Sequence, residues 1–164
     1  MRSEDFERLY EEYAQPLFGF LAYRTGNRAA AEDLLAETFE RALKARWRFD
    51  RRKGTEKAWL YAIALNCLRD QQRRAGAEQR ALERAHSVDD AGEDAERRVG
   101  RRDELQRGMA ELSGEEREAI ALRFGADLTV REIAALTGET ESTVHGRVYR
   151  ALRKLRERIA PGDA

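Results

Sequence analysis

The chain has 164 residues, and its 31 Lys and Arg side chains balance its 31 Asp and Glu side chains. Charged residues make up 38% of the sequence, against about a quarter in an ordinary globular protein, so we expect a thin core. The length excludes most multi-layer enzymes, and the single Cys excludes both an internal disulfide framework and a multi-Cys metal site. Because no apolar run approaches the roughly 18 residues of a membrane span, we expect a soluble, cytoplasmic, mainly helical protein without direct membrane insertion.

The first predicted helix begins near Phe6, and its apolar residues recur every three or four positions as far as Leu21. Pro16 is expected to kink this helix or to start its second half, because it removes one backbone donor. A break at 25–27 precedes a second predicted helix over 30–46. The inward positions of the second helix are Leu34, Leu35, Thr38, Phe39 and Leu43.

A basic loop over 49–55 precedes a third predicted helix over 56–74. The apolar stripe of this helix consists of Trp59, Leu60, Ile63, Ala64, Cys67 and Leu68. On its other side, Asn66, Arg69 and Arg73 follow at i, i+3 and i+7 and therefore share one face. Asn offers both a donor and an acceptor to a base edge, and Arg side chains bind phosphates, so this face is a candidate nucleic-acid surface.

Four aromatic residues lie among these basic side chains, a combination that single-stranded nucleic acid prefers. They are Trp47, Phe49, Trp59 and Tyr61. Core packing is the alternative explanation, and the register of Trp59 with Ile63 and Cys67 favours it for that residue.

The second predicted domain follows a stretch over 76–100 that has few large apolar residues and is acidic in its centre, as a flexible linker would be. Leu105, Met109 and Leu112 mark its first helix. Ser113 and Glu116 form a predicted capping box for the next helix, which includes Ala119, Ile120, Leu122 and Phe124. We therefore predict an all-α chain of two small helical domains, 1–75 and 101–164, joined by the linker 76–100.

A short helix, a turn containing Gly138 and a longer basic helix predict a helix-turn-helix unit in the second domain. Thr129 and Glu132 form a capping box for the short helix, and Thr140 caps the long one. The inward positions of the long helix are Val144, Val148, Leu152, Leu155 and Ile159, and its outward positions are Thr143, His145, Gly146, Arg147, Tyr149, Arg150, Arg153 and Lys154. Such a helix fits the major groove, although an ordinary helical hairpin with a basic surface has the same pattern.

The charge distribution supports two contacts with one polyanion. Residues 44–75 include 10 basic and 3 acidic side chains, and residues 143–158 include 6 basic and 1 acidic. The flanking stretches over 1–43 and 76–119 are acidic, with 9 acidic against 5 basic and 13 against 8 side chains respectively. Solvated helix faces explain one basic segment as well, but two such segments favour nucleic acid.

Four segments resemble a known family. Residues 31–39 and 58–66, followed by Asp70, Arg73 and Arg74, resemble region 2 of the extracytoplasmic-function (group IV) sigma factors of bacterial RNA polymerase. Residues 128–135 and 143–152 resemble their region 4. The resemblance implies a dissociable, non-enzymatic subunit without cofactor, metal or small-molecule substrate. Its implied partners are core RNA polymerase (the β′ clamp helices and the β flap), promoter DNA and an anti-sigma factor.

The resemblance also implies roles for individual residues. The implied polymerase contacts are Asp33, Leu34, Glu37 and Arg41. The implied contacts with the melted −10 element, including a loop that takes up a flipped base, are Phe49, Lys53, Lys57, Asn66, Arg69, Asp70, Arg73 and Arg74. The implied contacts with the −35 duplex are Arg123, Arg131, Thr143, His145, Gly146, Arg147, Arg150 and Lys154. Glu139 stands at a turn position that is normally apolar in this family.

Three other classes of protein are compatible with parts of the pattern. A sigma-like adaptor or decoy that binds an anti-sigma factor would keep the apolar stripes without needing Asn66, Arg73, Arg147 and Arg150 together. A repressor with a helix-turn-helix would act without polymerase. An enzyme is disfavoured because the sequence has no Ser-His-Asp or Cys-His set, no phosphate-binding glycine loop and no metal-ligand cluster.

Overall fold

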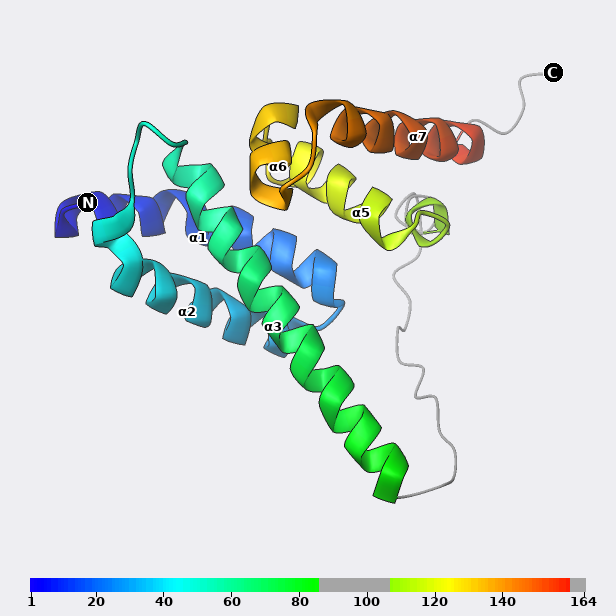
Figure 1. Cartoon of the computed structure of the whole chain (residues 1–164), viewed down its shortest axis with the longest axis horizontal. Helices are drawn as coiled ribbons and strands as arrows, with labels where there is room; N and C mark the ends of the chain where they lie inside the picture. Colours follow the sequence, from blue (N-terminus) through cyan, green and yellow to red (C-terminus); the bar gives the residue numbers. More distant parts are fainter. Residues whose placement is uncertain (86–106, 160–164) are drawn as a thin grey trace. The chain divides into compact units, whose positions relative to one another are not determined.

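The computed structural model describes residues 1–85 and 107–159, and the chain divides into two compact units, Met1–Ala95 and Glu96–Ala164. Figure 1 shows that the described parts are helical. Unit 1 consists of α1 (Ser3–Thr25), α2 (Arg28–Ala45), the short 3₁₀ turn η1 (Arg46–Arg48) and α3 (Glu56–Ala85). Unit 2 contains α5 (Gly114–Ile120), the π-helical turn η2 (Ala121–Gly125), α6 (Val130–Thr137) and α7 (Glu141–Ile159). The predicted all-α fold of two small helical domains is confirmed.

In unit 1, α1 and α2 form a hairpin that packs on α3. Two neighbouring residues cause the break between α1 and α2. Gly26 ends α1 with φ 64°, and the Asn27 side chain, at the start of α2, accepts a hydrogen bond from the Ala30 N–H at 3.0 Å. Pro16 is exposed and α1 runs through it as one helix, so it does not start a separate segment. The core combines the predicted stripes and is made by Leu9, Leu17, Leu21, Leu34, Leu60, Leu65 and Leu68, all almost fully buried.

Several predicted orientations are wrong at the edges of the apolar stripes. Leu43 and Leu152 were predicted to face inward, but they are exposed, as is Phe124 in η2. Each lies where the helix surface turns away from its neighbours, because an apolar stripe is wider than the strip that the partner helix covers. Tyr61, a candidate stacking residue for nucleic acid, is instead buried and packs edge-to-face on Phe20 with ring centroids 5.3 Å apart.

The third helix is longer than predicted. The sequence indicated an end at Arg74, but α3 continues to Ala85, so the first ten residues of the predicted linker are helical (Figure 1). The added segment is rich in Ala, Glu, Gln and Arg, which favour helices without any apolar stripe, and Gly76 does not interrupt it. Residues 86–100 of the predicted linker and Leu105 lie outside the described residues.

Unit 2 is organised by the predicted caps. The Ser113 hydroxyl accepts from the Glu116 N–H at 3.2 Å and the Glu116 carboxylate accepts from the Ser113 N–H at 3.0 Å, which starts α5. Thr129 and Glu132 form the same reciprocal pair at α6, which ends at Gly138 with φ 74°. Thr140 accepts from the Thr143 N–H at 3.2 Å and starts α7. These caps fix where each helix begins, so α6, the turn and α7 form the predicted helix-turn-helix.

The core of unit 2 lies along one side of α7. Val144, Val148, Ala151 and Leu155 are buried there against α5 and α6. The helical residues 107–110 also reach α7: a Cβ added to Gly108 would lie 2.9 Å from Leu155 Cδ2. This side of α7 therefore faces the core of unit 2.

Candidate nucleic-acid interface

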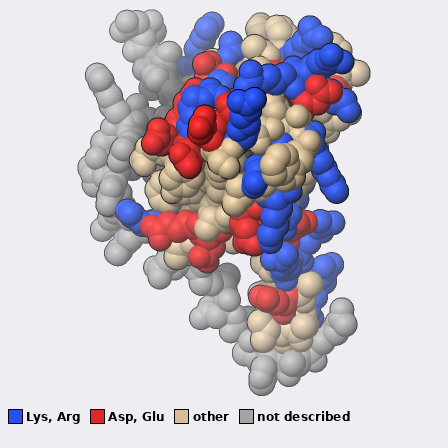
Figure 2. All heavy atoms as spheres, turned by 90° about the vertical axis from the view of Figure 1, so that its left-hand side faces the viewer, with Lys and Arg blue, Asp and Glu red and all other residues tan. Residues whose placement is uncertain are grey.

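The predicted row on α3 faces solvent. Asn66, Arg69 and Arg73 are exposed, while Leu60, Ala64, Cys67 and Leu68 on the other side of the helix are buried. Their spacing puts them on one face, as the sequence indicated. Arg74 is exposed as well. Figure 2 shows Lys and Arg side chains along the lower part of the molecule, where α3 runs.

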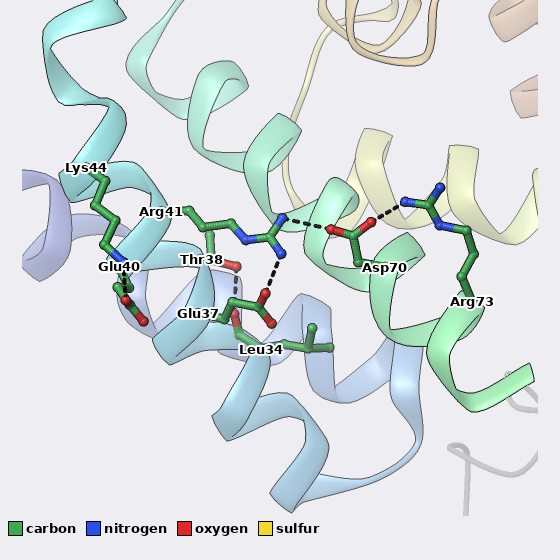
Figure 3. Close-up of polar contacts among 8 residues, drawn as sticks. All are labelled: Leu34, Glu37, Thr38, Glu40, Arg41, Lys44, Asp70 and Arg73. Atoms are coloured by element: carbon green, nitrogen blue, oxygen red, sulfur yellow. Dashed lines mark hydrogen bonds and ion pairs between the residues drawn. The ribbon is translucent and has the colours of Figure 1, made fainter. Parts of the chain in front are cut away.

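Asp70 links this row to α2 through a chain of ion pairs (Figure 3). One carboxylate oxygen accepts from Arg41 Nη1 at 2.9 Å and the other pairs with Arg73, while Arg41 also pairs with Glu37 at 2.5 Å. These hydrogen bonds from Arg41 and Arg73 hold the pKa of Asp70 below its ordinary value. Asp70 was predicted to contact DNA; in the free chain each of its oxygens pairs with an arginine, and these pairs join α3 to α2 and hold Arg73 beside the carboxylate.

The four predicted polymerase contacts on α2 are not equivalent. Asp33 is exposed, but Leu34 is 1% exposed and belongs to the core, where its carbonyl accepts from the Thr38 hydroxyl at 2.6 Å. Leu34 therefore cannot contact a polymerase, and that prediction is wrong. Glu37 and Arg41 are half-buried in the network with Asp70.

The exposed surface at the end of α2 contains an apolar pair that the sequence analysis did not assign to it. Leu43 is 41% exposed, and Trp47, four residues later in η1, is 72% exposed. The Arg46 guanidinium lies 4.4 Å from the centroid of the Trp47 ring and covers part of it. A large exposed Trp near an exposed Leu is typical of a protein interface. The sequence analysis did not predict this surface because Leu43 also fits the apolar stripe of α2.

The basic loop after η1 is fastened at both ends. Phe49 packs on Trp59 with ring centroids 5.2 Å apart, and Arg51 pairs with Glu56 at 3.0 Å. Arg8 from α1 pairs with the same carboxylate at 3.1 Å. Between these anchors Lys53 is exposed, and Lys57 is half-buried. A hollow of about 550 Å³ opens beside the loop, lined by Met1, Arg2, Glu4, Asp5, Phe49, Arg51 and Glu56.

Helix α7 divides its basic side chains between two sides. On the side toward α5, Arg147 pairs with Glu139 and with Glu115 at 3.1 Å, and its side chain is 18% exposed. Lys154 pairs with Glu116 at 2.8 Å. Both residues were predicted to face DNA. In the structure both form ion pairs within unit 2, although the Lys154 side chain remains 41% exposed. A stripe of basic residues does not show which of its members meet the acidic residues of neighbouring elements.

The outer side of α7 keeps the other predicted residues. Thr143, His145 and Arg150 are exposed, and Gly146 between them is half-buried. An added Cβ on Gly146 would lie 3.4 Å from Arg150 Nη1, so the missing side chain leaves room for that guanidinium. Arg150 thus takes the outward position that was predicted for Arg147 as well.

Two further predicted residues lie outside α7. Arg123 stacks over the exposed Phe124 at 5.3 Å from the ring centroid, and Arg131 is exposed on α6. Their positions leave both guanidinium groups within reach of solvent.

Cys67 is buried in the core of unit 1, and burial raises the pKa of its thiol, which keeps it neutral. The described part of the chain holds no group of three or more His, Cys, Asp or Glu side chains suited to a metal ion. Among the residues that the structure describes, no helix is long and apolar enough to cross a membrane.

Comparison with known proteins matches both units. The family model of Sigma-70 region 2 matches residues 9–78, and that of Sigma-70, region 4 matches residues 108–157. The chain is 33% identical over 156 residues to the RNA polymerase sigma factor CarQ of Myxococcus xanthus, covering 93% of this chain and 87% of CarQ. It is 32% identical over 166 residues to the ECF RNA polymerase sigma factor BldN of Streptomyces coelicolor, covering 99% of this chain but 62% of BldN.

Comparison with solved structures also finds sigma factors. The sigma factor RpoE, in complex with the anti-sigma factor NepR from Bartonella quintana, is 26% identical with a TM-score of 0.77 over 95% of this chain and 97% of RpoE. CnrH, in complex with the cytosolic domain of CnrY, is 25% identical with a TM-score of 0.65 over 95% of this chain and 88% of CnrH. With both regions matched in order and with sigma factors as relatives, the chain belongs to the extracytoplasmic-function family of RNA polymerase sigma factors.

Proposed function

We propose that this chain binds core RNA polymerase and directs promoter-specific transcription initiation by recognising a −10 and a −35 element. The observation that supports it best is the solvent-facing row of Asn66, Arg69 and Arg73 on a helix whose other face is buried. In region 2 of the family this helix contacts opened DNA strands. The proposed domains are 1–75 for region 2, 76–100 for the linker and 101–164 for region 4, with α3 extending into the linker.

Polymerase docking is assigned to the exposed side of α2 and η1. Asp33, Leu43 and Trp47 combine an acidic group with exposed apolar surface, which suits a protein partner rather than DNA. Glu37 and Arg41 then act from the edge of this surface through their ion pair.

Binding of the −10 element is assigned to the α3 row and the basic loop. Asn66 offers hydrogen bonds to a base edge, while Arg69, Arg73 and Arg74 bind phosphates. Phe49 and Lys53 are available to a base that leaves the stack, and stacking offsets part of its cost of a few kcal/mol. The anchors at Glu56 keep the loop in place before DNA arrives.

Recognition of the −35 duplex is assigned to the outer side of α7. Thr143, His145 and Arg150 are the side chains proposed to enter the major groove. Arg123 and Arg131 are proposed to hold phosphates on either side. Arg147 and Lys154 are proposed to support this surface through their ion pairs with Glu139, Glu115 and Glu116.

Three features of the cellular setting follow from the same proposal. The chain catalyses no reaction itself, because bond formation belongs to the polymerase. It works in the cytoplasm, where polymerase and promoter DNA are found. An anti-sigma factor is its proposed regulator, by analogy with the complexes of RpoE with NepR and of CnrH with CnrY.

Run-off transcription tests the function directly. Core bacterial polymerase is combined with the purified full chain and a library of genomic fragments from the source organism, and the transcripts are mapped. We expect initiation at defined sites that share two sequence elements upstream. An adaptor or decoy would give no transcripts, and a polymerase-independent repressor would bind fragments without starting transcription, so either result contradicts the proposal.

Arg150 and Arg147, one turn apart on α7, have different proposed roles. Arg150 contacts DNA, and Arg147 stabilises unit 2 through its ion pairs. We expect Arg150→Ala to weaken binding of the holoenzyme to a promoter fragment recovered in that experiment by about 10-fold, since it removes one direct contact. Arg147→Ala removes the partner of Glu139 and Glu115, so it is expected to speed hydrogen exchange in α7. Equal loss of DNA binding in both variants, with unchanged exchange, would contradict this division.

A further inference from the structure

The last part of α3 extends without the packing that stabilises the rest of unit 1. Every side chain from Ala77 to Leu82 is exposed. A segment exposed on all sides gains little from burial, and Gly76 directly before it costs about 1 kcal/mol relative to Ala. A helix maintained under these conditions is a candidate contact surface for a partner.

Arg80 continues the row that begins at Asn66. Asn66, Arg69, Arg73 and Arg80 follow at spacings of three, four and seven residues, so they share one face of the helix. At 1.5 Å per residue, this row is about 21 Å long. Glu78 lies nine residues after Arg69 and therefore on the opposite side of α3. The row therefore contains three arginines, and the acidic group at its edge, Asp70, pairs with Arg41 and Arg73.

Gly76 occupies the position in this row between Arg73 and Arg80. Arg80 Nε donates a hydrogen bond to the Gly76 carbonyl at 3.0 Å. A Cβ on Gly76 would lie 4.0 Å from Arg80 Nη2. The guanidinium therefore lies back along the row over the glycine, where the helix backbone is accessible to a close ligand.

We propose that α3 beyond Arg74 is an additional DNA contact, in which Arg80 binds a backbone phosphate of the duplex next to the opened strand held by Asn66 and Arg69. The inference rests on the proposed function of α3. DNA is favoured over a protein partner because the row consists of three arginines, an asparagine and a glycine, while the exposed Leu82 lies on the other side of the helix. The row matches about six base pairs of duplex in length, enough to pass from opened to paired DNA.

Two DNA probes and two matched variants test the contact. The probes are a fork, with a single-stranded −10 element and paired DNA upstream, and the single strand alone, both from a promoter recovered by run-off transcription. Holoenzyme with Arg80→Gln is compared with holoenzyme containing Glu78→Gln, which changes the charge two residues away on the opposite face. Gln favours helices about as well as Arg and Glu do, so both variants keep the helix.

We expect Arg80→Gln to weaken fork binding by about 3-fold to 10-fold and to reduce the slope of log affinity against log salt by about 1. The affinity of Arg80→Gln holoenzyme for the single strand should stay within about 2-fold of the unaltered value, because only a contact with the duplex has been removed. The affinity of Glu78→Gln holoenzyme for the fork should also stay within about 2-fold, because that charge lies on the opposite face. Unchanged fork binding by Arg80→Gln overturns the proposal. So does equal loss on both probes, or a loss of affinity for core polymerase instead of DNA, which would indicate a protein contact.

The outcomes also separate this inference from the proposed function. If holoenzyme with the unaltered chain binds the fork and starts transcription while Arg80→Gln behaves identically, the function stands and only the additional contact fails. If the unaltered chain supports no promoter binding, the proposed function fails first.

Discussion

Trp47→Ala is expected to reduce the affinity of the full chain for core RNA polymerase by about 30-fold or more. Trp47 is 72% exposed, and a Trp at the centre of a protein interface commonly contributes about 2 kcal/mol or more when truncated, which corresponds to about 30-fold in affinity. Because its side chain is hardly buried in the free chain, the free energy of unfolding should change by less than about 0.5 kcal/mol. Titration of labelled chain with core polymerase, followed by fluorescence anisotropy, measures the effect.

Two variants control for this experiment. Trp47→Phe keeps an aromatic surface and is expected to lose less affinity than Trp47→Ala. Arg46→Gln removes the cation over the ring and tests whether the stacked guanidinium contributes to docking. If Trp47→Ala binds polymerase within about 2-fold of the unaltered chain, the docking surface does not include η1.

Glu116→Ala is expected to destabilise unit 2 by about 3 kcal/mol. Its carboxylate joins two structures: it accepts from the Ser113 N–H at the start of α5 and pairs with Lys154 of α7 at 2.8 Å. The Glu116 side chain is only 8% exposed. Its loss removes the acceptor of the Ser113 N–H and the ion-pair partner of the Lys154 ammonium group. Hydrogen exchange on the full chain, compared between peptides from α5 and α7 and peptides from α3, assigns the loss to unit 2.

The same carboxylate makes the stability of unit 2 dependent on acid. Hydrogen bonds from Lys154 and from the Ser113 backbone hold the pKa of Glu116 below its ordinary value of 4.5. A lowered pKa in the folded state means that this stabilisation is complete above about pH 4.5 and is lost as the pH falls through the lower, folded value. Glu116→Gln, which retains a capping residue but no charge, should be less sensitive to pH in that range.

Glu157→Ala is the matched control for Glu116→Ala. Glu157 also faces a basic residue, Arg153, but at 3.8 Å and with 69% of its side chain exposed. An exposed pair of this kind contributes about 0–1 kcal/mol. Equal exchange rates for the two variants would show that Glu116 has no special structural role.

The distinction between Arg147 and Arg150 explains why site residues are harder to predict than folds. Both are basic, both lie outside the apolar stripe of α7, and they are three positions apart in the sequence. Their difference comes from Glu115 and Glu139, which lie outside α7 and form ion pairs with Arg147. No pattern within residues 141–159 contains that information.

Features that depend on near neighbours along the chain could be predicted from the amino-acid pattern. The breaks at Gly26 and Gly138, the capping pairs Ser113–Glu116 and Thr129–Glu132, and the shared face of Asn66 and Arg69 follow from local backbone geometry and helical periodicity. Composition also sufficed for the all-α class.

The packing of the helices, in contrast, fixes which side chains are buried, paired or exposed. Arg41 meets Asp70 across 29 positions of sequence, Lys154 meets Glu116 across 38, and Leu34 is buried although a docking role was predicted for it. The physical reason is that the rotation of each helix about its own axis is set by the packing of its neighbours. A pairing between distant charges therefore exists only after the helices have been assembled.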